Sequence, residues 1–351
     1  MISFLKQRCS PIGVDVGQRS VKLLQMDGDR TTVVQTARWD LVAPEQDAGG
    51  PPSAQSVTSA IKRALQSRKF YGSEAVLCLG GRQLFVQNIR VPKTATTDLE
   101  TVVKQEAAGK VPFSITETEV RYLEAADIRQ GDTTRREVIL LACHRPQLEG
   151  YLDCVVAAGL RPVAVDVEPA ALVRCYAHQY RRDQDRQQRV MYVHVGATST
   201  VVVIAQGANA LFVKYLDLGG SHMNDAVARG LGMEPSAATM MRMHNGDRRK
   251  DQQDPEVAAG VEQALRPVLD QLANELLLCI RYHSVTFRGQ RLARVVIGGG
   301  EASDMLVEQL NGRLDLTCEL GDPFRTCKLK TEVRRRTQWD IAAGLALRGT
   351  E

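Results

Sequence analysis

Two glycine-led turns stand at matching places in the two halves of the chain, and each follows a run rich in β-branched residues. Gly17 directly follows the run PIGVDV, and Gly196 directly follows the run VMYVHV. After each glycine come a short polar stretch, a second strand-like run, a turn that contains glycine and a third strand-like run. The two glycines are 196 − 17 = 179 residues apart in a chain of 351. This spacing predicts two related lobes rather than a short-period repeat.

The residue types in these turns are suited to binding phosphate. Glycine permits a positive φ and leaves no Cβ between the backbone and a ligand. Successive amide groups can then point at phosphate oxygens, together with nearby hydroxyl groups. The hydroxyl groups available in the two turns belong to Ser20, Thr198, Ser199 and Thr200. A single glycine hairpin is common as plain structure, whereas the matched pair favours a phosphate held between two lobes.

Two further segments place glycines at a corner between a strand and a helix. The segment RVVIGGGEASDMLVEQLNGRL contains Gly298, Gly299 and Gly300, and LDLGGSHMNDAVARGLG contains Gly219 and Gly220. Such corners permit the close approach of a flat ligand or of another backbone segment. The chain then ends with WDIAAGLALRG, which predicts a helix whose small residues allow tight packing.

Composition narrows the function classes. The chain is 44% hydrophobic and 25% charged with a net charge of +4, as in an ordinary globular protein. Its scattered basic residues and 5% aromatic content weigh against nucleic-acid binding. Eight cysteines without a CxxC pair indicate a reducing compartment, and no histidine spacing indicates a metal site. No apolar run approaches the roughly 18 residues of a membrane span, so we expect a cytoplasmic protein.

Taken in order, these segments resemble the actin-like ATPase superfamily. GVDVGQRSVKLL is similar to its first phosphate loop, VHVGATSTVVV to its second, VVIGGGEAS to its adenosine loop and DIAAGLALRG to its last connecting helix. The narrower resemblance is to the type IV pilus assembly family PilM, which is itself similar to the cell-division protein FtsA. It also rests on VPKTATTDLETVVKQEAAGKVPFSITETEVRY, AAGLRPVAVDVEPAAL and RPVLDQLANELLLCIRYH, and runs from about residue 12 to the C-terminus.

The resemblance implies an actin-like (ribonuclease H-like) α/β fold of two duplicated lobes with a small inserted α/β subdomain. The expected division is a first lobe of 1–90, 164–189 and 336–351, an insert of 91–163, a second lobe of 190–232 and 290–335, and a helical subdomain of 233–289. Within the insert, a helix started by Pro146 is predicted to turn Leu148, Leu152, Val155 and Val156 inward.

The resemblance also implies a site for ATP and Mg²⁺. The expected nucleotide-binding residues are Asp15, Gly17, Gln18, Ser20, Lys22, Gly196, Ala197, Thr198, Ser199, Thr200, Gly219, Gly220, Gly298, Gly299, Gly300 and Glu301. Asp15 is a candidate for positioning the metal or a water molecule, and no other catalytic residue or metal ligand is predicted.

Two departures from the family pattern point to weak or lost hydrolysis. Relatives carry aspartate where this chain has His194, and neutral imidazole is a poor ligand for Mg²⁺. His194 can equally be a strand histidine with a satisfied hydrogen bond. Where the family has an acidic residue and a lysine that meet the nucleoside, the run AATMMR supplies one basic residue, Arg242. Whether nucleotide is bound or retained stays open from the sequence.

As for partners, the resemblance implies an interaction protein. PilM-like proteins hold the cytoplasmic N-terminal tail of the single-span membrane protein PilN in a groove between the first lobe and the inserted subdomain. The candidate groove residues are Phe85, Arg90, Val91, Pro92 and Phe113. Association with the inner membrane would then be indirect. An active ATPase or small-molecule kinase, and a filament-forming homo-oligomer, remain as alternatives, as does the choice between a pilus and another envelope machine.

Overall fold

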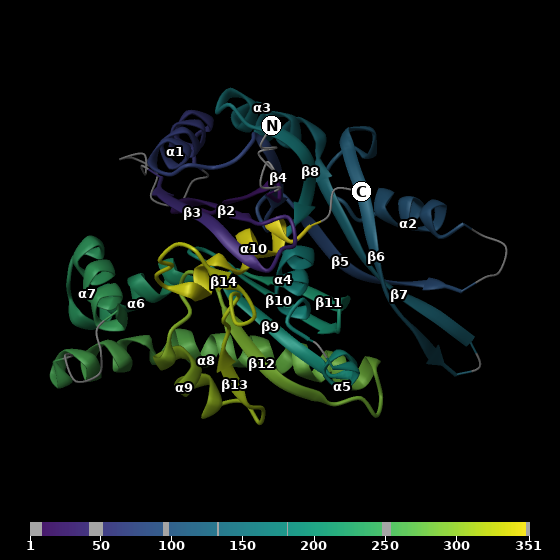
Figure 1. Ribbon diagram of the computed structural model, residues 1–351. Coiled ribbons are helices and arrows are strands. Elements are labelled where there is room, and N and C mark those ends of the chain that lie inside the picture. The colour runs from purple at the N-terminus through teal and green to yellow at the C-terminus, as the bar shows by residue number, and fades with distance from the viewer. Residues whose placement is uncertain are drawn as a thin grey trace, which may run out of the picture.

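Three β-sheets organise the chain (Figure 1). The structure is a computed structural model that describes residues 9–41, 52–93, 98–131, 133–180, 182–247 and 254–348. Apart from one short strand, the two larger sheets are built from the N-terminal and the C-terminal half of the chain respectively. The small sheet extends to one side of the molecule together with α2 (Leu99–Ala108). The remaining residues, which include parts of the expected first lobe and of the helical subdomain, lie outside the described residues.

The first sheet has the strand order β14-β3-β2-β1-β4-β8. Its strands are β1 (Ile12–Val16), β2 (Ser20–Met26), β3 (Thr32–Asp40), β4 (Glu74–Leu79), β8 (Arg161–Val167) and β14 (Lys328–Leu329). β1, β2 and β3 form an antiparallel meander, and β4 pairs parallel to β1. The helices α1 (Ala54–Ser67) and α3 (Arg145–Ala157) pack against this sheet, so their apolar faces share its core.

The second sheet repeats the arrangement of the first, with the order β11-β10-β9-β12-β13. Its strands are β9 (Arg189–Val195), β10 (Thr200–Gln206), β11 (Asn209–Leu216), β12 (Leu292–Gly298) and β13 (Cys318–Leu320). Asp15 pairs with Lys22 in the first sheet, and His194 pairs with Val201 in the second. The offsets are the same, 194 − 15 = 179 and 201 − 22 = 179. The predicted duplicated two-lobe fold is therefore confirmed down to strand register.

The third sheet is the inserted unit, ordered β5-β7-β6 and antiparallel throughout. Its strands are β5 (Phe85–Pro92), β6 (Thr118–Gln130) and β7 (Thr133–His144), with a short 3₁₀ turn, η1 (Ile115–Glu117), before β6. Helix α2 covers one face. The sheet also contacts the second lobe, because the Asn88 side chain donates to the carbonyl of Val213 at 2.7 Å and accepts from its amide at 3.2 Å.

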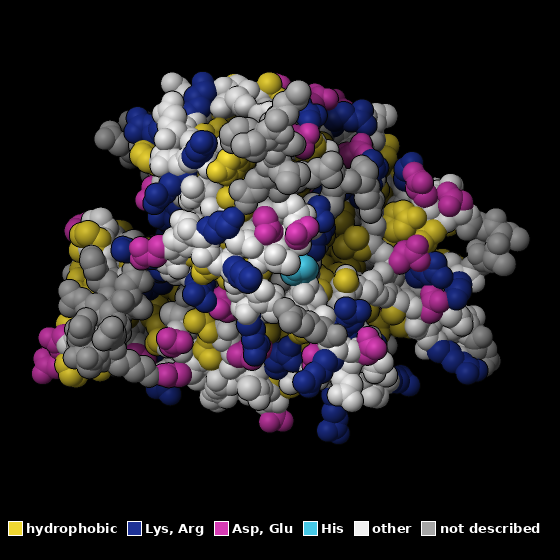
Figure 2. Space-filling model, viewed as in Figure 1, with side chains coloured by type: hydrophobic (Ala, Val, Ile, Leu, Met, Phe, Trp, Pro, Cys, Tyr) yellow, Lys and Arg dark blue, Asp and Glu magenta, His cyan; other side chains and the backbone are white. Residues whose placement is uncertain are grey.

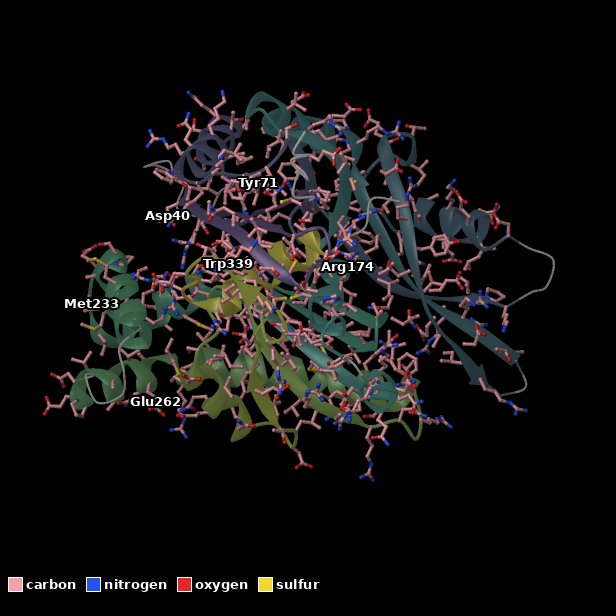
Figure 3. All side chains as sticks on the ribbon, viewed as in Figure 1. Asp40, Tyr71, Arg174, Met233, Glu262 and Trp339 are labelled. Atoms are coloured by element: carbon pink, nitrogen blue, oxygen red, sulfur yellow. The ribbon has the colours of Figure 1, made fainter. Side chains whose placement is uncertain are left out.

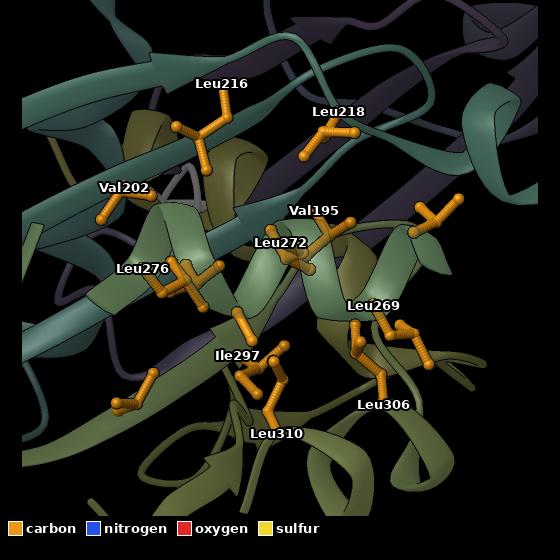
Figure 4. Close-up of a cluster of buried hydrophobic side chains, with 14 of the residues drawn as sticks. Val195, Val202, Leu216, Leu218, Leu269, Leu272, Leu276, Ile297, Leu306 and Leu310 are labelled. Atoms are coloured by element: carbon orange, nitrogen blue, oxygen red, sulfur yellow. The ribbon is translucent and has the colours of Figure 1, made fainter. Parts of the chain in front are cut away.

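A layer of helices covers one face of the second sheet and shares a hydrophobic core with it (Figure 4). The core on this side is shared with α6 (Gly220–Leu231), α8 (Pro255–Thr286) and α9 (Asp304–Asn311), and α7 (Pro235–Asp247) packs on the outside against α6 and α8. In α8, Leu269, Leu272 and Leu276 face the sheet, and α9 adds Leu306 and Leu310 to the same core. The 32-residue helix α8 contains Pro267 in its interior, within the stretch that was predicted to be mostly helical.

The opposite face of the second sheet meets the first lobe through α4 (Glu168–Ala177) and α10 (Asp340–Ala346). Trp339, at the end of the 3₁₀ turn η3 (Arg336–Trp339), and Arg174 of α4 both lie near α10 in the middle of the molecule (Figure 3). Arg174 donates to the carbonyl of Gly344 at 2.9 Å. The short helix α5 (Asp183–Gln187) leads from α4 into the second sheet.

The proposed domain division stays a prediction, but one of its boundaries falls inside a strand, and one residue expected to face inward does not. β5 spans the predicted boundary at residue 90 and belongs to the inserted sheet. Tyr151, Cys154 and Val155 of α3 are buried with the first sheet, whereas Val156 is 57% exposed. The expectation that Val156 faces inward is therefore wrong, because the buried stripe of α3 passes through Tyr151 and Cys154 instead.

The surface and the thiol groups of the described residues have the following features. On the face shown in Figure 2, basic and acidic side chains are interspersed. All eight cysteines, each among the described residues, are free thiols. Within the described ranges, no helix combines the length and apolar character needed to cross a membrane.

Candidate nucleotide cleft and partner surface

The two glycine hairpins face a single cleft of about 370 Å³ between the lobes. The cleft is lined from the first lobe by Asp15, Gly17, Gln18, Ser20 and Lys22, and from the second by Gly196, Ala197, Thr198, Ser199, Gly300 and Glu301. Eleven of the sixteen predicted nucleotide-binding residues thus lie on one surface. This convergence is what a phosphate site built by lobe duplication requires.

The same hydrogen bond closes both turns. The Gly17 amide donates to the Ser20 carbonyl at 3.0 Å, and the Gly196 amide donates to the Ser199 carbonyl at 2.9 Å. A Cβ at Gly196 would lie 2.9 Å from the Ser199 carbonyl oxygen, so the tight turn needs glycine there. Two tight turns with the same internal bond therefore open toward the same space.

The other five predicted residues support the cleft from behind. Thr200 is fully buried and donates to the Leu218 carbonyl at 2.7 Å. A Cβ at Gly219 would lie 2.7 Å from the Gly196 carbonyl oxygen, and one at Gly220 would lie 2.4 Å from the Glu301 carboxylate. Gly298 and Gly299 pack in the same way against Asp340 and Val195. These residues let the cleft walls approach each other closely, and their contact with a nucleotide stays a prediction.

Asp15 and Lys22 form a buried ion pair on the floor of the cleft. The Lys22 Nζ donates to the Asp15 Oδ2 at 2.6 Å, and the two side chains are 7% and 10% exposed, Asp15 being the less exposed. They are cross-strand partners on β1 and β2, so the sheet register itself brings them together. The pair offers a cation to a phosphate, while the Asp15 carboxylate is already partnered.

His194 occupies the equivalent position in the second lobe and binds Asp340. Its Nδ1 lies 2.9 Å from both carboxylate oxygens of Asp340, which is fully buried at the start of α10. Burial acts to lower the pKa of His194, but the Asp340 charge and hydrogen bond outweigh it and raise the pKa above its usual value. His194 is therefore a strand histidine with a satisfied hydrogen bond, as one of the two interpretations of the sequence had it.

Glu168 is a cleft carboxylate that the sequence reasoning did not single out. It stands at the first position of α4, and the Tyr215 hydroxyl donates to its Oε2 at 3.0 Å. Burial raises the pKa of Glu168 above its ordinary value, although nearby His194 and the Tyr215 hydrogen bond act in the opposite direction. Its signal in the sequence was an acidic residue followed by proline where the strand ending in VDV turns into a helix.

A second ion-pair group crosses the cleft from lobe to lobe. The Arg19 Nη1 lies 2.7 Å from the Glu301 Oε1, and the Arg242 Nη2 of α7 lies 2.6 Å from the Glu301 Oε2. Both oxygens of Glu301 are therefore occupied by guanidinium groups. In the family pattern, the residues at the position of Arg242 contact a nucleoside. In this protein Arg242 binds the carboxylate of Glu301.

The predicted partner-groove residues fall into two groups at opposite ends of β5. Phe85 pairs with Ala142 of β7, and Pro92 pairs with Arg135 at the far end, about 23 Å away at the usual rise of a strand. Val91 is fully buried under α2, and Arg90 binds Glu137 and, at 3.0 Å, the Thr286 hydroxyl. Arg90, Val91 and Pro92 thus belong to the end of β5 that lies away from the cleft.

The remaining two groove residues lie at the end of the inserted sheet that adjoins the first lobe. The ring of Phe113 stacks on His144, the last residue of β7, with 5.2 Å between ring centroids. Phe85 lines a hollow of about 440 Å³ between β5 and the edge strand β11, together with Phe212 and Tyr282. The strand partner of Phe85 is Ala142, which stands two residues before His144 in β7. The structure therefore brings Phe85 and Phe113 to the same end of the sheet.

A family model described as type IV pilus assembly protein PilM matches residues 13–350. The chain belongs to this PilM family. A solved structure entitled "PilM-PilN type IV pilus biogenesis complex" is 23% identical, with a TM-score of 0.79 over 97% of this chain and 99% of that chain. The ethanolamine utilization protein EutJ from Carboxydothermus hydrogenoformans follows at 14% identity and a TM-score of 0.59, covering 98% and 91%.

A third similar structure is MreB5 of Spiroplasma citri bound to ADP, at 10% identity and a TM-score of 0.51, covering 96% of this chain and 94% of that chain. These likenesses confirm the actin-like fold of this PilM family member.

The cleft of this PilM family member fits the phosphate part of a nucleotide better than its metal. The two hairpins, the hydroxyls of Ser20, Thr198 and Ser199, and the Lys22 ammonium group all suit phosphate oxygens. Mg²⁺ would need carboxylate oxygens, yet Asp15 is paired with Lys22 and Asp340 with His194. Among the described residues, no three acidic, histidine or cysteine side chains are grouped to hold a metal ion.

The His194–Asp340 pair predicts a pH-dependent stability difference between wild type and His194→Gln. The raised pKa means that the folded protein binds the proton more tightly than the unfolded chain, whose histidine titrates near 6.5. The contribution is thus complete below about pH 6.5 and is lost as pH rises through the folded pKa. Urea unfolding from about pH 6 to 9 should therefore show a stability gap that narrows steadily toward high pH.

The gap between the two proteins, and not the wild-type curve, is the quantity to compare. His283 titrates in the opposite sense, because burial and then Arg189 lower its pKa to about 4. That effect is common to both proteins and cancels in the difference. A gap that is constant across the range, or that widens with pH, would contradict a protonated His194 in the folded state.

Proposed function

We propose that this PilM family member is an actin-like scaffold of a type IV pilus or related envelope assembly machine. It holds the cytoplasmic N-terminal tail of a single-span, PilN-like inner-membrane protein, and so stands at the inner membrane through that partner. The observation that carries the proposal is the family match across residues 13–350. The solved PilM-PilN complex, which has the same fold, supports the kind of partner.

Nucleotide binding is the second part of the proposal. The cleft presents two opposed glycine hairpins and the Lys22 cation to a nucleoside polyphosphate. Hydrolysis is expected to be weak or lost, because Asp15 and Asp340 are each held by a basic side chain of the protein. We therefore expect the bound nucleotide to act by holding the two lobes in one arrangement, and not by rapid hydrolysis.

For the tail we propose the cleft-side end of the inserted sheet, around Phe85 and Phe113. This end adjoins the first lobe, since Arg82 and Gln83, just before β5, line the interlobe cleft. The hollow beside Phe85 also runs along β11, an edge strand of the second sheet. Edge backbone and aromatic pockets together are the elements with which proteins capture extended peptides.

Binding of a synthetic PilN-like tail tests this placement. We expect Phe85→Ala and Phe113→Ala each to weaken binding by about tenfold or more, as truncation of an aromatic anchor commonly does. Pro92→Ala is the matched control at the far end of β5 and should bind like wild type. Fluorescence titration gives the dissociation constants, and circular dichroism confirms that each variant is folded.

Two results would count against the proposal. If the wild-type protein does not bind the tail at micromolar concentration, the scaffold role itself fails. If Pro92→Ala weakens binding as much as Phe85→Ala, the tail lies along the whole of β5 and the proposed location is wrong.

A further inference from the structure

Glu301 joins three parts of the protein that are distant in sequence. It follows the Gly298–Gly300 corner, and its carboxylate binds Arg19 of the first hairpin and Arg242 of α7. Gly220 makes room for it, since a Cβ there would lie 2.4 Å from the carboxylate. The Glu301 side chain is 5% exposed, so its carboxylate is largely shielded from water.

The two arginines are held very differently. Arg242 is 9% exposed and also donates through its Nε to the Asn224 side chain at 2.7 Å. It therefore forms a fixed pair with Glu301 inside the second lobe. Arg19 is 35% exposed and reaches Glu301 from the opposite lobe, 282 positions away in the sequence. Arg19 is the member that can leave without stranding a buried charge, because Glu301 would keep Arg242.

Arg19 also stands where a bound phosphate would attract it. It lies within the hairpin that the Gly17 amide closes onto the Ser20 carbonyl, and that hairpin faces the Thr198–Ser199 turn across the cleft. A guanidinium group binds phosphate and carboxylate through the same bidentate geometry. A polyphosphate held by the two hairpins would thus compete with Glu301 for the same group.

We propose that Arg19 is an interlobe latch that exchanges partners when a polyphosphate binds. Without ligand, Arg19 binds Glu301 and ties the first hairpin to the second lobe. With ligand, Arg19 moves to the phosphate, and Glu301 stays with Arg242. The inference rests on the nucleotide-binding part of the proposed function. It adds that Arg19 responds to the bound phosphate and that Glu301 competes with the phosphate for Arg19.

The exchange predicts opposite effects for the two partners. Glu301→Gln removes the competing charge, so the affinity for polyphosphate should rise by about five- to tenfold. Arg19→Gln removes the group that phosphate recruits, so the affinity should fall by about tenfold. The double variant should bind like Arg19→Gln alone, because the competitor matters only while Arg19 is present.

Isothermal titration with ATP and with inorganic tripolyphosphate measures these effects. Equal shifts for both probes place the latch on the phosphates, whereas a shift for ATP alone would overturn the assignment to phosphate. Asp270→Asn is the matched control, since Asp270 forms a comparable 2.7 Å pair with Arg313 on the second lobe away from the cleft. It should leave both affinities unchanged.

A ligand-free measurement tests the latch independently. Hydrogen exchange of the backbone amides in 299–302 should be faster in Arg19→Gln than in wild type, and unchanged in Arg313→Gln. Equal exchange in Arg19→Gln and wild type would overturn the latch even if Glu301→Gln proves too unstable to titrate.

The titrations distinguish a failure of nucleotide binding from a failure of the Arg19 partner exchange. If no protein, wild type included, binds either probe, the nucleotide part of the proposed function fails and the exchange fails with it. If wild type binds but Glu301→Gln binds no more tightly, the nucleotide site stands and only the exchange is wrong.

Discussion

Gly344→Ala should destabilise the protein by about 3 kcal/mol, since a Cβ at this position would lie 1.9 Å from the Ala171 carbonyl oxygen of α4. Backbone atoms cannot rotate away as a side chain can, so the helices must separate. On the other side of α10, a Cβ at Gly13 of β1 would lie 2.4 Å from the Ala342 carbonyl oxygen. The helix is held between two backbones and has little room to move.

The expected loss corresponds to a fall of about 6 °C in Tm for a protein of this size. Thermal unfolding followed by circular dichroism measures it. Gly150→Ala in the middle of α3 is the matched control, because a Cβ at Gly150 would meet nothing within 4 Å. That exposed helical glycine should gain about 0.5–1 kcal/mol on replacement. Equal Tm values for Gly344→Ala and wild type would show that α10 and α4 are packed less closely.

The strand-and-turn features of the fold were predictable because each one is local in sequence. The twin hairpins, the glycine corner after β12 and the small-residue helix α10 all appear as runs of suitable residues bounded by turn signals. Even the register of the two lobes follows, since the spacing of 179 residues carries over from Gly17 and Gly196 to every paired position of the hairpins. The shared cleft then follows from the duplication.

The partners of the cleft side chains were not predictable in the same way. His194 meets Asp340 across 146 positions, and Arg19 meets Glu301 across 282. No local pattern marks such pairs, because tertiary packing alone brings them together. Glu168 had a local signal, since it precedes a proline at a strand-to-helix corner, but its partner Tyr215 belongs to the other sheet and was not predictable. The prediction that Val156 faces inward was wrong for a smaller reason, because the buried face of α3 passes through Tyr151 and Cys154 and leaves Val156 exposed.

Lys22→Met should cost about 3–5 kcal/mol, because it leaves the Asp15 carboxylate buried without its partner. At 7% exposure, Asp15 cannot recover the lost interaction from water. The second lobe shows how the chain avoids this problem where the cation is missing. Val201 occupies the position equivalent to Lys22, and the residue opposite it is His194 rather than an aspartate. Each hairpin thus carries a compatible cross-strand pair, Asp15 with Lys22 in the first lobe and His194 with Val201 in the second.

Combining Lys22→Met with Asp15→Asn separates stability from ligand binding. The double variant removes both charges, so its free energy of unfolding should recover most of the loss, and the double-mutant coupling should reach about 2–3 kcal/mol. Its affinity for tripolyphosphate should nevertheless stay low, because the cation that faces the hairpins is gone. Urea unfolding and titration on the same samples measure both quantities. A double variant that regained phosphate binding along with stability would mean that Lys22 serves the fold alone, and that the hairpins hold phosphate without it.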